Sequence, residues 1–419
     1  MLLVCYLRGE EKLGFEQFTL TAPTPLCTVP GVPAPRAQVS ENKLWVYFDR
    51  GHLVFNGTTG QIEDYVVDGV PLLHPDPEGE IGPAVALYRA PLDNDMNLRR
   101  NWERLGLDRA CFYIKKPGTV AKMYMVTDNG VEITADYVLA GPRVPRLGSF
   151  RLTYTVYRTG KVRLDVLCLR PNRRLRHLPR YGVVLEMPSA FDQVRYYGMG
   201  PYPNLSDYNL HCHTGIFETA VATMHEDYIK PQESSARTDT RWAQVTDRQG
   251  FGLRFDAIDA PMTFAADPYT SQRCAKARHR EELTAGGTTC IHLDQYQLGA
   301  GSNACGPVPH HGHTRNTPAT GCSVLALNQR GSAMIEIGTD LVLVSRMEKS
   351  LQIPGFAERV FSEPERVYCK TAESFAGIFA AKEAYYKALG TGLQLPLNAL
   401  PCCTMIGASR ILTASGQQN

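Results

Sequence analysis

The chain has 419 residues, of which 43% are hydrophobic and 21% are charged, a composition typical of a soluble protein with a sizeable core. This length predicts two or three domains. A formal net charge of +2 argues against a polyanionic partner. The densest basic run, residues 170–180, has no interleaved aromatic residues and is interpreted as a solvated loop, so no nucleic-acid partner is expected.

Twelve cysteines are scattered along the chain without a CxxC pair, which argues against the usual zinc and thioredoxin-like spacings. The apolar run at the N-terminus is too short for a signal peptide, and no segment has the roughly eighteen apolar residues that a membrane span needs. These features predict a cytoplasmic protein with reduced thiols and no membrane association.

Residues 40–305 alternate short apolar runs with turn signals, the pattern of an antiparallel β-protein. The clearest hairpin is predicted over 151–171, where Val162, Leu164 and Val166 share one face and "RTGK" forms the turn. No long stretch here has helical periodicity. Further strands are predicted within 43–73, 181–188, 250–256 and 288–298. A large antiparallel β-sandwich is the expected architecture.

The last third has a different pattern. Alternating apolar residues predict a strand over 334–344, and residues 373–389 have the period of a helix that Thr371 could cap. Residues 310–333 are rich in Gly, Thr and Asn and have no sustained period. The expected boundaries are 308–333 for a junction, 334–400 for a second, α+β domain and 401–419 for an unstructured tail.

Four stretches of the sandwich region stand in a characteristic order. They are "YRAPLDNDMN" (88–97) followed by "NWERLGL" (101–107), "YYGMGPYPNLSDY" (196–208), "DYIKPQESSARTDTRW" (227–242), and "DPYTSQ" (267–272) with "HLDQYQLGAGSNACGP" (292–307). Together they resemble the C-terminal domain, or small chain, of the β-galactosidases of glycoside hydrolase family 2. The resemblance covers residues 40–307 and implies a mainly β fold, a broad β-supersandwich of the galactose-mutarotase-like type.

The N-terminal stretch "GEEKLGFEQFTL" (9–20) resembles the last strand of the immunoglobulin-like domain that precedes this sandwich in the family. Residues 1–39 are therefore predicted to be a remnant of that domain and a linker.

The resemblance implies one part of an enzyme. Glycoside hydrolysis needs two carboxylates at the scissile bond, and in the family both are glutamates on a (β/α)8 barrel. This sequence has no eightfold alternation of strands and helices. We therefore expect no hydrolysis by this chain alone, and we expect a barrel-bearing large chain as its partner and a galactoside sugar as its ligand.

The family's sandwich completes the sugar pocket with a loop that carries Trp or Cys. That loop corresponds to "GSNACGP" here, which places Cys305 at the contributing position and Asn303 beside it. A Gly-rich turn with a buried cysteine explains the same residues equally well. The family's closing strands are expected after Pro307, where this chain has the junction, so an open sheet edge is predicted.

Two groups of histidines also need an interpretation. "HCH" would place His211 and His213 on one strand face, as metal ligands or catalytic bases can be. No third ligand has a suitable spacing, so surface histidines are the preferred interpretation. The histidines of "HHGH" (310–313) are interpreted in the same way.

Three stretches near the C-terminus resemble holo-acyl-carrier-protein synthase. They are "MIEIGTDLVLVSRM" (334–347), "FAERVFSEPERVYC" (356–369) and "AGIFAAKEAYYKALGTGL" (376–393). These enzymes transfer 4′-phosphopantetheine from coenzyme A to a serine of an acyl carrier protein. The resemblance implies that a formerly separate protein, starting at Met334, has been joined to the sandwich.

The resemblance implies a magnesium site. Asp340, at the end of the predicted strand, and Glu383, on the helix, match the family's Mg²⁺ ligands, and such a cation neutralises phosphate charge during transfer. Lys387 lies one helical turn after Glu383 and would steady the phosphate or the attacking hydroxyl. The residues alone also fit an ordinary i,i+4 Glu–Lys pair with Asp340 as a strand-end cap.

Coenzyme A contacts are expected beside this site. Lys382 is interpreted as a solvated neighbour or a coenzyme A phosphate contact, and Gly390 and Gly392 would let the backbone approach the ligand. Two features depart from the family: Ile378 replaces a phosphate-binding arginine, and the resemblance fades after residue 400, where the family continues. An incomplete gene fusion with little activity in either half is therefore an alternative.

Overall fold

The computed structural model describes residues 2–8, 11–18, 34–73, 82–172, 174–175, 177–258, 260–301, 324–328 and 344–388. The chain divides into two compact units, which are described separately: Pro25–Gly331, and Met1–Thr24 with Ser332–Asn419. None of the described helices is long and apolar enough to cross a membrane.

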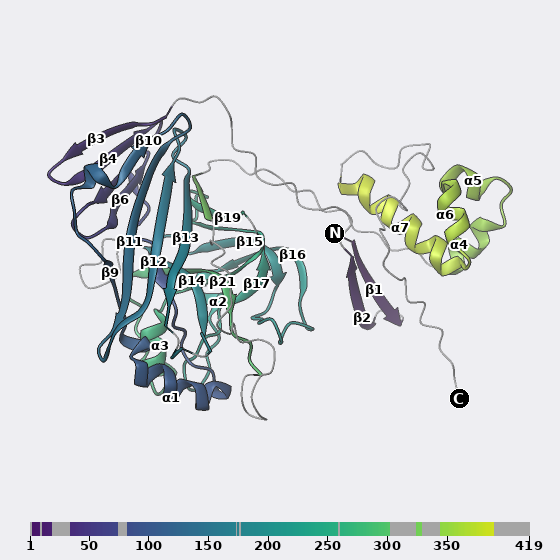
Figure 1. The fold of residues 1–419 in the computed structure, drawn as a ribbon. Helices are drawn as coiled ribbons and strands as arrows, with labels where there is room; N and C mark the ends of the chain where they lie inside the picture. Colours follow the sequence, from purple (N-terminus) through teal and green to yellow (C-terminus); the bar gives the residue numbers. More distant parts are fainter. Residues whose placement is uncertain are drawn as a thin grey trace. The chain divides into compact units, whose positions relative to one another are not determined.

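The larger unit contains a ten-stranded antiparallel sheet. Its strands are β9 (Cys111–Ile114), β10 (Tyr124–Val126), β11 (Val131–Gly141), β12 (Val144–Val156), β13 (Val162–Pro171), β15 (Gln193–Gly200), β16 (His213–Ala220), β18 (Trp242–Thr246), β19 (Gly252–Ala257) and β22 (Val324–Asn328). The order is β10-β11-β12-β13-β22-β19-β18-β15-β16, and β9 pairs with β11. The long strands β11, β12 and β13 lie side by side (Figure 1).

Two five-stranded antiparallel sheets complete this unit. One consists of β8 (Ala84–Ala86), β14 (Arg180–Pro188), β17 (Arg237–Thr240), β20 (Met262–Asp267) and β21 (Thr288–Gln297), in the order β17-β20-β21-β14-β8. The other runs in sequence order through β3 (Arg36–Ser40), β4 (Lys43–Phe48), β5 (Gly51–Asn56), β6 (Gln61–Val67) and β7 (Val70–Pro71). Leu44, Leu152 and Ile291 belong to one continuous core that draws on all three sheets. The predicted mainly β sandwich is confirmed.

Short helices connect the strands. They are η1 (Asp93–Asp95), α1 (Met96–Leu105), η2 (Leu107–Arg109), η3 (Val120–Lys122), α2 (Val221–Met224), α3 (Ser271–Lys276) and η4 (Arg280–Glu282). Helix α1 was not predicted, although Leu98, Trp102 and Leu105 recur at helical spacing, because ten residues make fewer than three turns within a region of strands. This helix ends at Gly106, whose φ of 74° is the left-handed conformation that favours glycine.

The hairpin predicted over 151–171 is confirmed. β12 and β13 pair antiparallel with Val156 opposite Val162, next to the predicted turn. Val162, Leu164 and Val166 are buried, which places the apolar residues on the core face as the alternation predicts. Other strand predictions, within 43–73, 181–188, 250–256 and 288–298, correspond to β4 to β7, β14, β19 and β21.

The junction predicted over 308–333 is wrong in one part. Residues 324–328 form β22, which pairs antiparallel with both β13 and β19 in the middle of the ten-stranded sheet. The expected open edge is therefore filled by β22. The run "VLALN" is short and flanked by Gly, Thr and Asn, so its strand signal was masked by its neighbours. The sequence of a strand inside a sheet is often a short apolar run of this kind.

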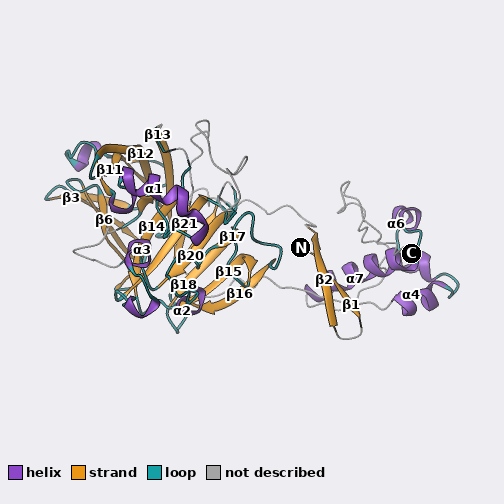
Figure 2. Cartoon of the chain, turned by 90° about the horizontal axis from the view of Figure 1, so that it is seen from below, coloured by secondary structure: helices purple, strands orange, loops and turns teal. Residues whose placement is uncertain are grey.

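In its described residues, the smaller unit has an antiparallel pair, β1 (Leu2–Arg8) with β2 (Glu11–Phe18), and four helices. The helices, purple in Figure 2, are α4 (Val344–Leu351), α5 (Phe356–Val360), α6 (Glu363–Tyr368) and α7 (Ala372–Ala388). The predicted helix is confirmed as α7, and the predicted cap is present because Ser374 N donates to Thr371 Oγ1 at 3.4 Å. Most of the predicted strand over 334–344 and the tail over 401–419 lie outside the described residues; Val344 begins α4.

These helices enclose a small core. Its members are Met347, Val360, Phe361, Cys369, Ala376 and Ile378. Ile378, which replaces a phosphate-binding arginine of the family, is one of these buried residues. At this position the side chain contributes to packing.

Candidate functional site

A buried ion pair lies at the base of the predicted sugar loop. Arg89, after β8, and Asp95, in η1, are both fully buried, and Arg89 Nη2 donates to the two carboxylate oxygens at 3.0 and 2.9 Å. Arg89 also donates to the carbonyl oxygens of Leu298 and of Gly299, the latter at 3.2 Å. A buried charge needs partners, and Arg89 and Asp95 are partners of each other. Through its bonds to the two carbonyl oxygens, Arg89 also holds the backbone that follows β21.

Two further polar side chains hold the same backbone. Asp207 accepts hydrogen bonds from the backbone N–H groups of Ala300, at 2.7 Å, and Gly301, at 2.8 Å. Asn94 Nδ2 donates to the Ala300 carbonyl oxygen at 2.8 Å. A Cβ at position 299 would collide with the Asp207 carboxylate, so glycine is required for this approach. We call residues 298–301 the loop stem.

The predicted sugar contacts follow the stem directly. Asn303 and Cys305 lie outside the described residues, two and four positions after Gly301. Their role stays a prediction. Sequence analysis quoted Arg89, Asp95 and Asp207 within the family stretches without giving them a role, because their joint contact with the stem depends on tertiary structure.

A second buried ion network ties the family stretches together. Arg180, in β14, donates from Nε to Asp294 Oδ2 and from Nη2 to Glu233 Oε2, both at 2.8 Å. Burial raises the pKa of Asp294 to about 7, although the charge of Arg180 opposes this shift. Arg180 closes the basic run interpreted as a solvated loop, and for this residue the interpretation is wrong, since its side chain is fully buried.

Exposed apolar and aromatic side chains lie in the segment that contains Asp207. Tyr202 and Tyr208 are 61% and 57% exposed, and Leu210 is 96% exposed. The ring of His211 lies 4.6 Å from that of Tyr208 and 6.3 Å from that of Tyr202, measured between centroids. An exposed apolar group of this kind commonly marks a surface that another molecule covers.

The histidines of "HCH" do not share a strand face as expected. His211 precedes β16 and its Nε2 lies 3.0 Å from the Pro203 carbonyl oxygen, whereas His213 begins β16 and packs edge-on against Phe217. Within the described part of the chain, neither belongs to a group of residues that could hold a metal.

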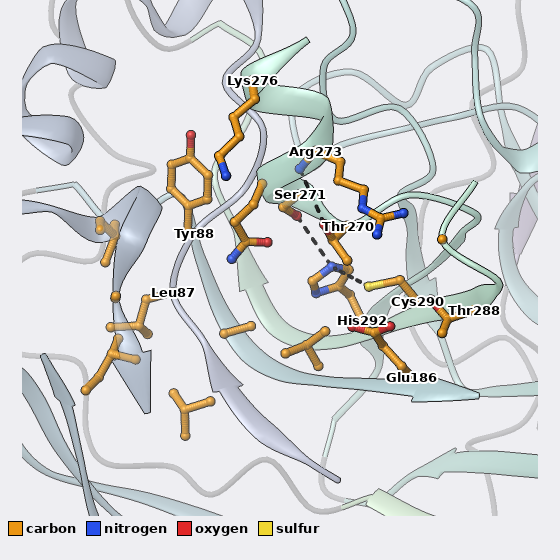
Figure 3. A pocket seen from close by; sticks show the side chains of 18 of the residues that line it. Leu87, Tyr88, Glu186, Thr270, Ser271, Arg273, Lys276, Thr288, Cys290 and His292 are labelled. Atoms are coloured by element: carbon orange, nitrogen blue, oxygen red, sulfur yellow. Dashed lines mark hydrogen bonds between the residues drawn. The ribbon is translucent and has the colours of Figure 1, made fainter. Parts of the chain in front are cut away.

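A cavity of about 430 Å³ lies between α3 and the strands β8, β14 and β21 (Figure 3). His292 Nε2 lies 3.5 Å from Ser271 Oγ and 3.7 Å from Cys290 Sγ. Burial and the charge of Arg180 hold the pKa of His292 well below its usual range, so the imidazole is neutral. Glu186 also lines this cavity. The arrangement can accept a small polar molecule, and among the predicted site residues that the structure describes none lines it.

The profile of the family described as "Beta galactosidase small chain" matches residues 49–324. The chain belongs to this family. The β-galactosidase of Staphylococcus xylosus is 29% identical over 53% of this chain, and that of Actinobacillus pleuropneumoniae is 25% identical over 72% of it. The matched parts span only 21% and 28% of those two relatives.

A solved structure of a galactose mutarotase related enzyme from Lactobacillus acidophilus covers 70% of this chain and 98% of its own, at 12% identity and a TM-score of 0.36. With a TM-score this low, the match carries no conclusion about the chain.

In the helical part that follows the small-chain sandwich, Lys382 is fully buried. Its Nζ lies 2.7 Å from Glu365 Oε2, donates to the Val360 carbonyl oxygen at 2.9 Å and lies 5.7 Å from the centroid of the Phe361 ring. The interpretation of Lys382 as a solvated residue or a coenzyme A contact is therefore wrong in this structure. A buried ammonium needs a carboxylate beside it, and Glu365 supplies one.

The other predicted residues of this part are only partly described. Glu383 and Lys387 lie one turn apart within α7, and their side chains are outside the description. Asp340, Gly390 and Gly392 lie outside the described residues. The profile of the "4'-phosphopantetheinyl transferase superfamily" matches residues 336–418, which agrees with the resemblance to holo-acyl-carrier-protein synthase.

Proposed function

We propose that the sandwich acts as the small chain of a β-galactosidase and completes a galactoside pocket on a barrel-bearing large chain. The loop stem carries this proposal. Residues 298–301 are held by Arg89 and Asn94 from one family stretch and by Asp207 from another. These contacts fix the point from which the predicted sugar loop starts. Fixing a loop before binding lowers the entropy cost of forming a pocket.

The exposed side chains near Asp207 support a partner. Tyr202, Tyr208 and Leu210 form an apolar surface on the segment that holds the stem, and Ile229 is 77% exposed. Burying such side chains against a large chain would bring the predicted loop to a barrel. The two catalytic carboxylates would come from that barrel, as the family resemblance implies.

The test is reconstitution. The chain is mixed with a family 2 large chain that lacks its own small-chain domain, and complex formation and galactosidase activity are measured. We expect both to appear, and we expect Asp207→Ala to raise KM while the complex persists, because the stem is released. Asp128→Ala, at an exposed turn, is the control and should change nothing. Absence of a complex would contradict the proposal.

We also propose that the C-terminal part is a phosphopantetheinyl transferase that uses Mg²⁺ and coenzyme A to modify an acyl carrier protein. Asp340 and Glu383 suit the hard cation because carboxylate oxygens are its preferred protein ligands. When bound, the cation would neutralise charge on the transferred phosphate. Lys387, one turn from Glu383 on α7, would hold the phosphate or the serine hydroxyl of the carrier protein. Lys382 does not fit as a coenzyme A contact, because Glu365 and Val360 enclose its ammonium.

This second activity is tested by mass spectrometry of an apo acyl carrier protein after incubation with the chain, coenzyme A and Mg²⁺. A gain of one phosphopantetheine group, lost in Asp340→Ala and Glu383→Ala and retained in Glu373→Ala, is expected. Glu373 is an exposed carboxylate in the first turn of α7. No gain from a folded chain would favour the alternative, an incomplete fusion with little activity in this half.

We propose a reducing, cytoplasmic location for the chain, because Cys111, Cys168, Cys212, Cys274 and Cys290 are free thiols. Alkylation of the chain in freshly lysed cells, without added reductant, should label the exposed thiol of Cys111. A blocked Cys111 would contradict this location.

A further inference from the structure

Three side chains of the sandwich, away from the loop stem, form a group with metal-ligand chemistry. His225 follows α2, Asp267 ends β20 and Cys274 lies in α3. One nitrogen, oxygen or sulfur atom of each lies within 4.8 Å of the other two. Local patterns give none of the three a role: Asp267 opens the family stretch "DPYTSQ", and His225 and Cys274 have no metal-ligand spacing in the sequence.

The imidazole and carboxylate of this group are already oriented. His225 Nδ1 lies 2.9 Å from Asp267 Oδ2, which also accepts a hydrogen bond from the Ser235 hydroxyl. The backbone N–H of Tyr269 donates to Asp267 Oδ1 at 2.8 Å, and the Tyr269 ring packs edge-on against His225. Metal ligands in proteins are typically held by outer partners of this kind.

Burial and charge favour a cation here. The side chains of His225 and Asp267 are 4% and 13% exposed, and Cys274 is buried. Asp227 and Glu233 add negative charge around His225. The nearest lysine, Lys230, directs its ammonium to backbone carbonyl oxygens, including that of Cys274 at 3.1 Å.

We propose that His225, Asp267 and Cys274 bind a zinc ion that joins α3 to β20 and to the segment after α2. A thiolate, an imidazole and a carboxylate in one group suit Zn²⁺ better than Mg²⁺ or Ca²⁺, which prefer oxygen ligands alone. Three protein ligands leave one tetrahedral position, which a water molecule fills.

Binding involves a proton and no redox change. Burial raises the pKa of the Cys274 thiol, so the thiol is protonated before the metal enters. Zn²⁺ then forms a bond to sulfur, and the thiol proton leaves to solvent. A protonated His225 likewise releases one ring proton to solvent, which frees the nitrogen that binds the metal. Asp267 also lies close to Cys274 and favours the protonated thiol, whereas Lys230 opposes it. Because protons compete with the metal at Cys274 and His225, binding weakens as the pH falls.

Cobalt is the probe that tests this site in the full-length chain. After treatment with a chelator, Co²⁺ should bind and give the near-ultraviolet charge-transfer band of a cobalt–thiolate bond, and Zn²⁺ should displace it. Cys274→Ser should abolish the band, and His225→Gln should weaken Co²⁺ binding at least about tenfold. Cys212→Ser, at a buried cysteine outside the group, is the matched control and should retain the band.

Other metal-binding segments cannot imitate this result. The histidines at 310–313 stand between Cys305 and Cys322, and a thiolate band from that segment would persist in Cys274→Ser, whereas a band from the proposed site is lost. The site also needs neither a large chain nor a carrier protein, so its failure is separate from the failure of either proposed activity.

Folding of the variants is checked by thermal unfolding. In chelator, Cys274→Ser and the unaltered chain should have similar Tm values, and Zn²⁺ should raise Tm only for the unaltered chain. If Cys274→Ser does not fold, His225→Gln serves for the same comparison. The absence of a thiolate band, or a band that persists in Cys274→Ser, would overturn the proposal.

Discussion

The sandwich and the helical part both bury charged residues of their family stretches, and they use them differently. In the sandwich, Arg89 pairs with Asp95 and also holds the backbone of the loop stem. In the helical part, Lys382 pairs with Glu365 and donates to the Val360 carbonyl oxygen inside the core. A charged residue in a family motif can thus support a loop or simply fill a core, and its burial and partners show which.

The largest effect is expected at Arg89. Arg89→Met removes the guanidinium that pairs with the buried Asp95, which should lower the free energy of unfolding of the sandwich by about 3–5 kcal/mol. Denaturant unfolding measures this change. The control is Arg151→Met, since the Arg151–Asp136 pair is 46% and 32% exposed and exposed pairs contribute only about 0–1 kcal/mol. Equal losses in the two variants would show that Arg89 has no special structural role.

Lys382→Met tests the buried ion pair of the helical part. It removes the ammonium beside the buried Glu365, so we expect the free energy of unfolding to fall by about 3–5 kcal/mol, enough to expose α7 because the described part of the core has six buried residues. Hydrogen exchange of residues 372–388 measures this loss. Lys349→Met, at an exposed lysine of α4, should leave exchange unchanged. Unaltered exchange in Lys382→Met would restore the interpretation of a solvated lysine.

A proline in β22 tests whether this strand belongs to the sandwich. Ala326 lies opposite Val162 on one side and Phe255 on the other. Ala326→Pro removes a backbone N–H from the middle of the sheet and should cost about 1–3 kcal/mol of the unfolding free energy of the sandwich. Ala326→Gly keeps the N–H and should cost less. If both variants are as stable as the unaltered chain, residues 308–333 are a junction after all.

The smallest expected effect is a pH dependence of the stability of the sandwich, caused by His225. Burial lowers the pKa of His225, but the hydrogen bond and charge of Asp267 outweigh this and raise it above the usual 6.5. A raised histidine pKa stabilises the fold at pH values below 6.5, and this stabilisation disappears as the pH rises through the higher pKa of the folded state. We expect His225→Gln, measured in chelator, to lose this decline. Identical pH profiles for both chains would contradict this assignment.

The local patterns of the sequence determined most of the elements. Alternation predicted β12 and β13 with the correct face inward, and the period of residues 373–389 together with Thr371 predicted α7 and its cap. These predictions succeed because alternation and capping depend on neighbours within a few residues. The motif order also predicted the small-chain family, which the match to residues 49–324 confirms.

The positions of the loop stem, of β22 and of the buried polar groups depend on tertiary structure. The contacts that hold the loop stem join Arg89 to residues more than two hundred positions away, and β22 finds its place only between β13 and β19. Lys382 was interpreted as a solvated residue or a coenzyme A contact, but the packing of the helices buries it against Glu365. His225, Asp267 and Cys274 meet through three separate elements. Long-range contacts of this kind leave no short-range pattern, because which side chains meet depends on how the sheets and helices pack.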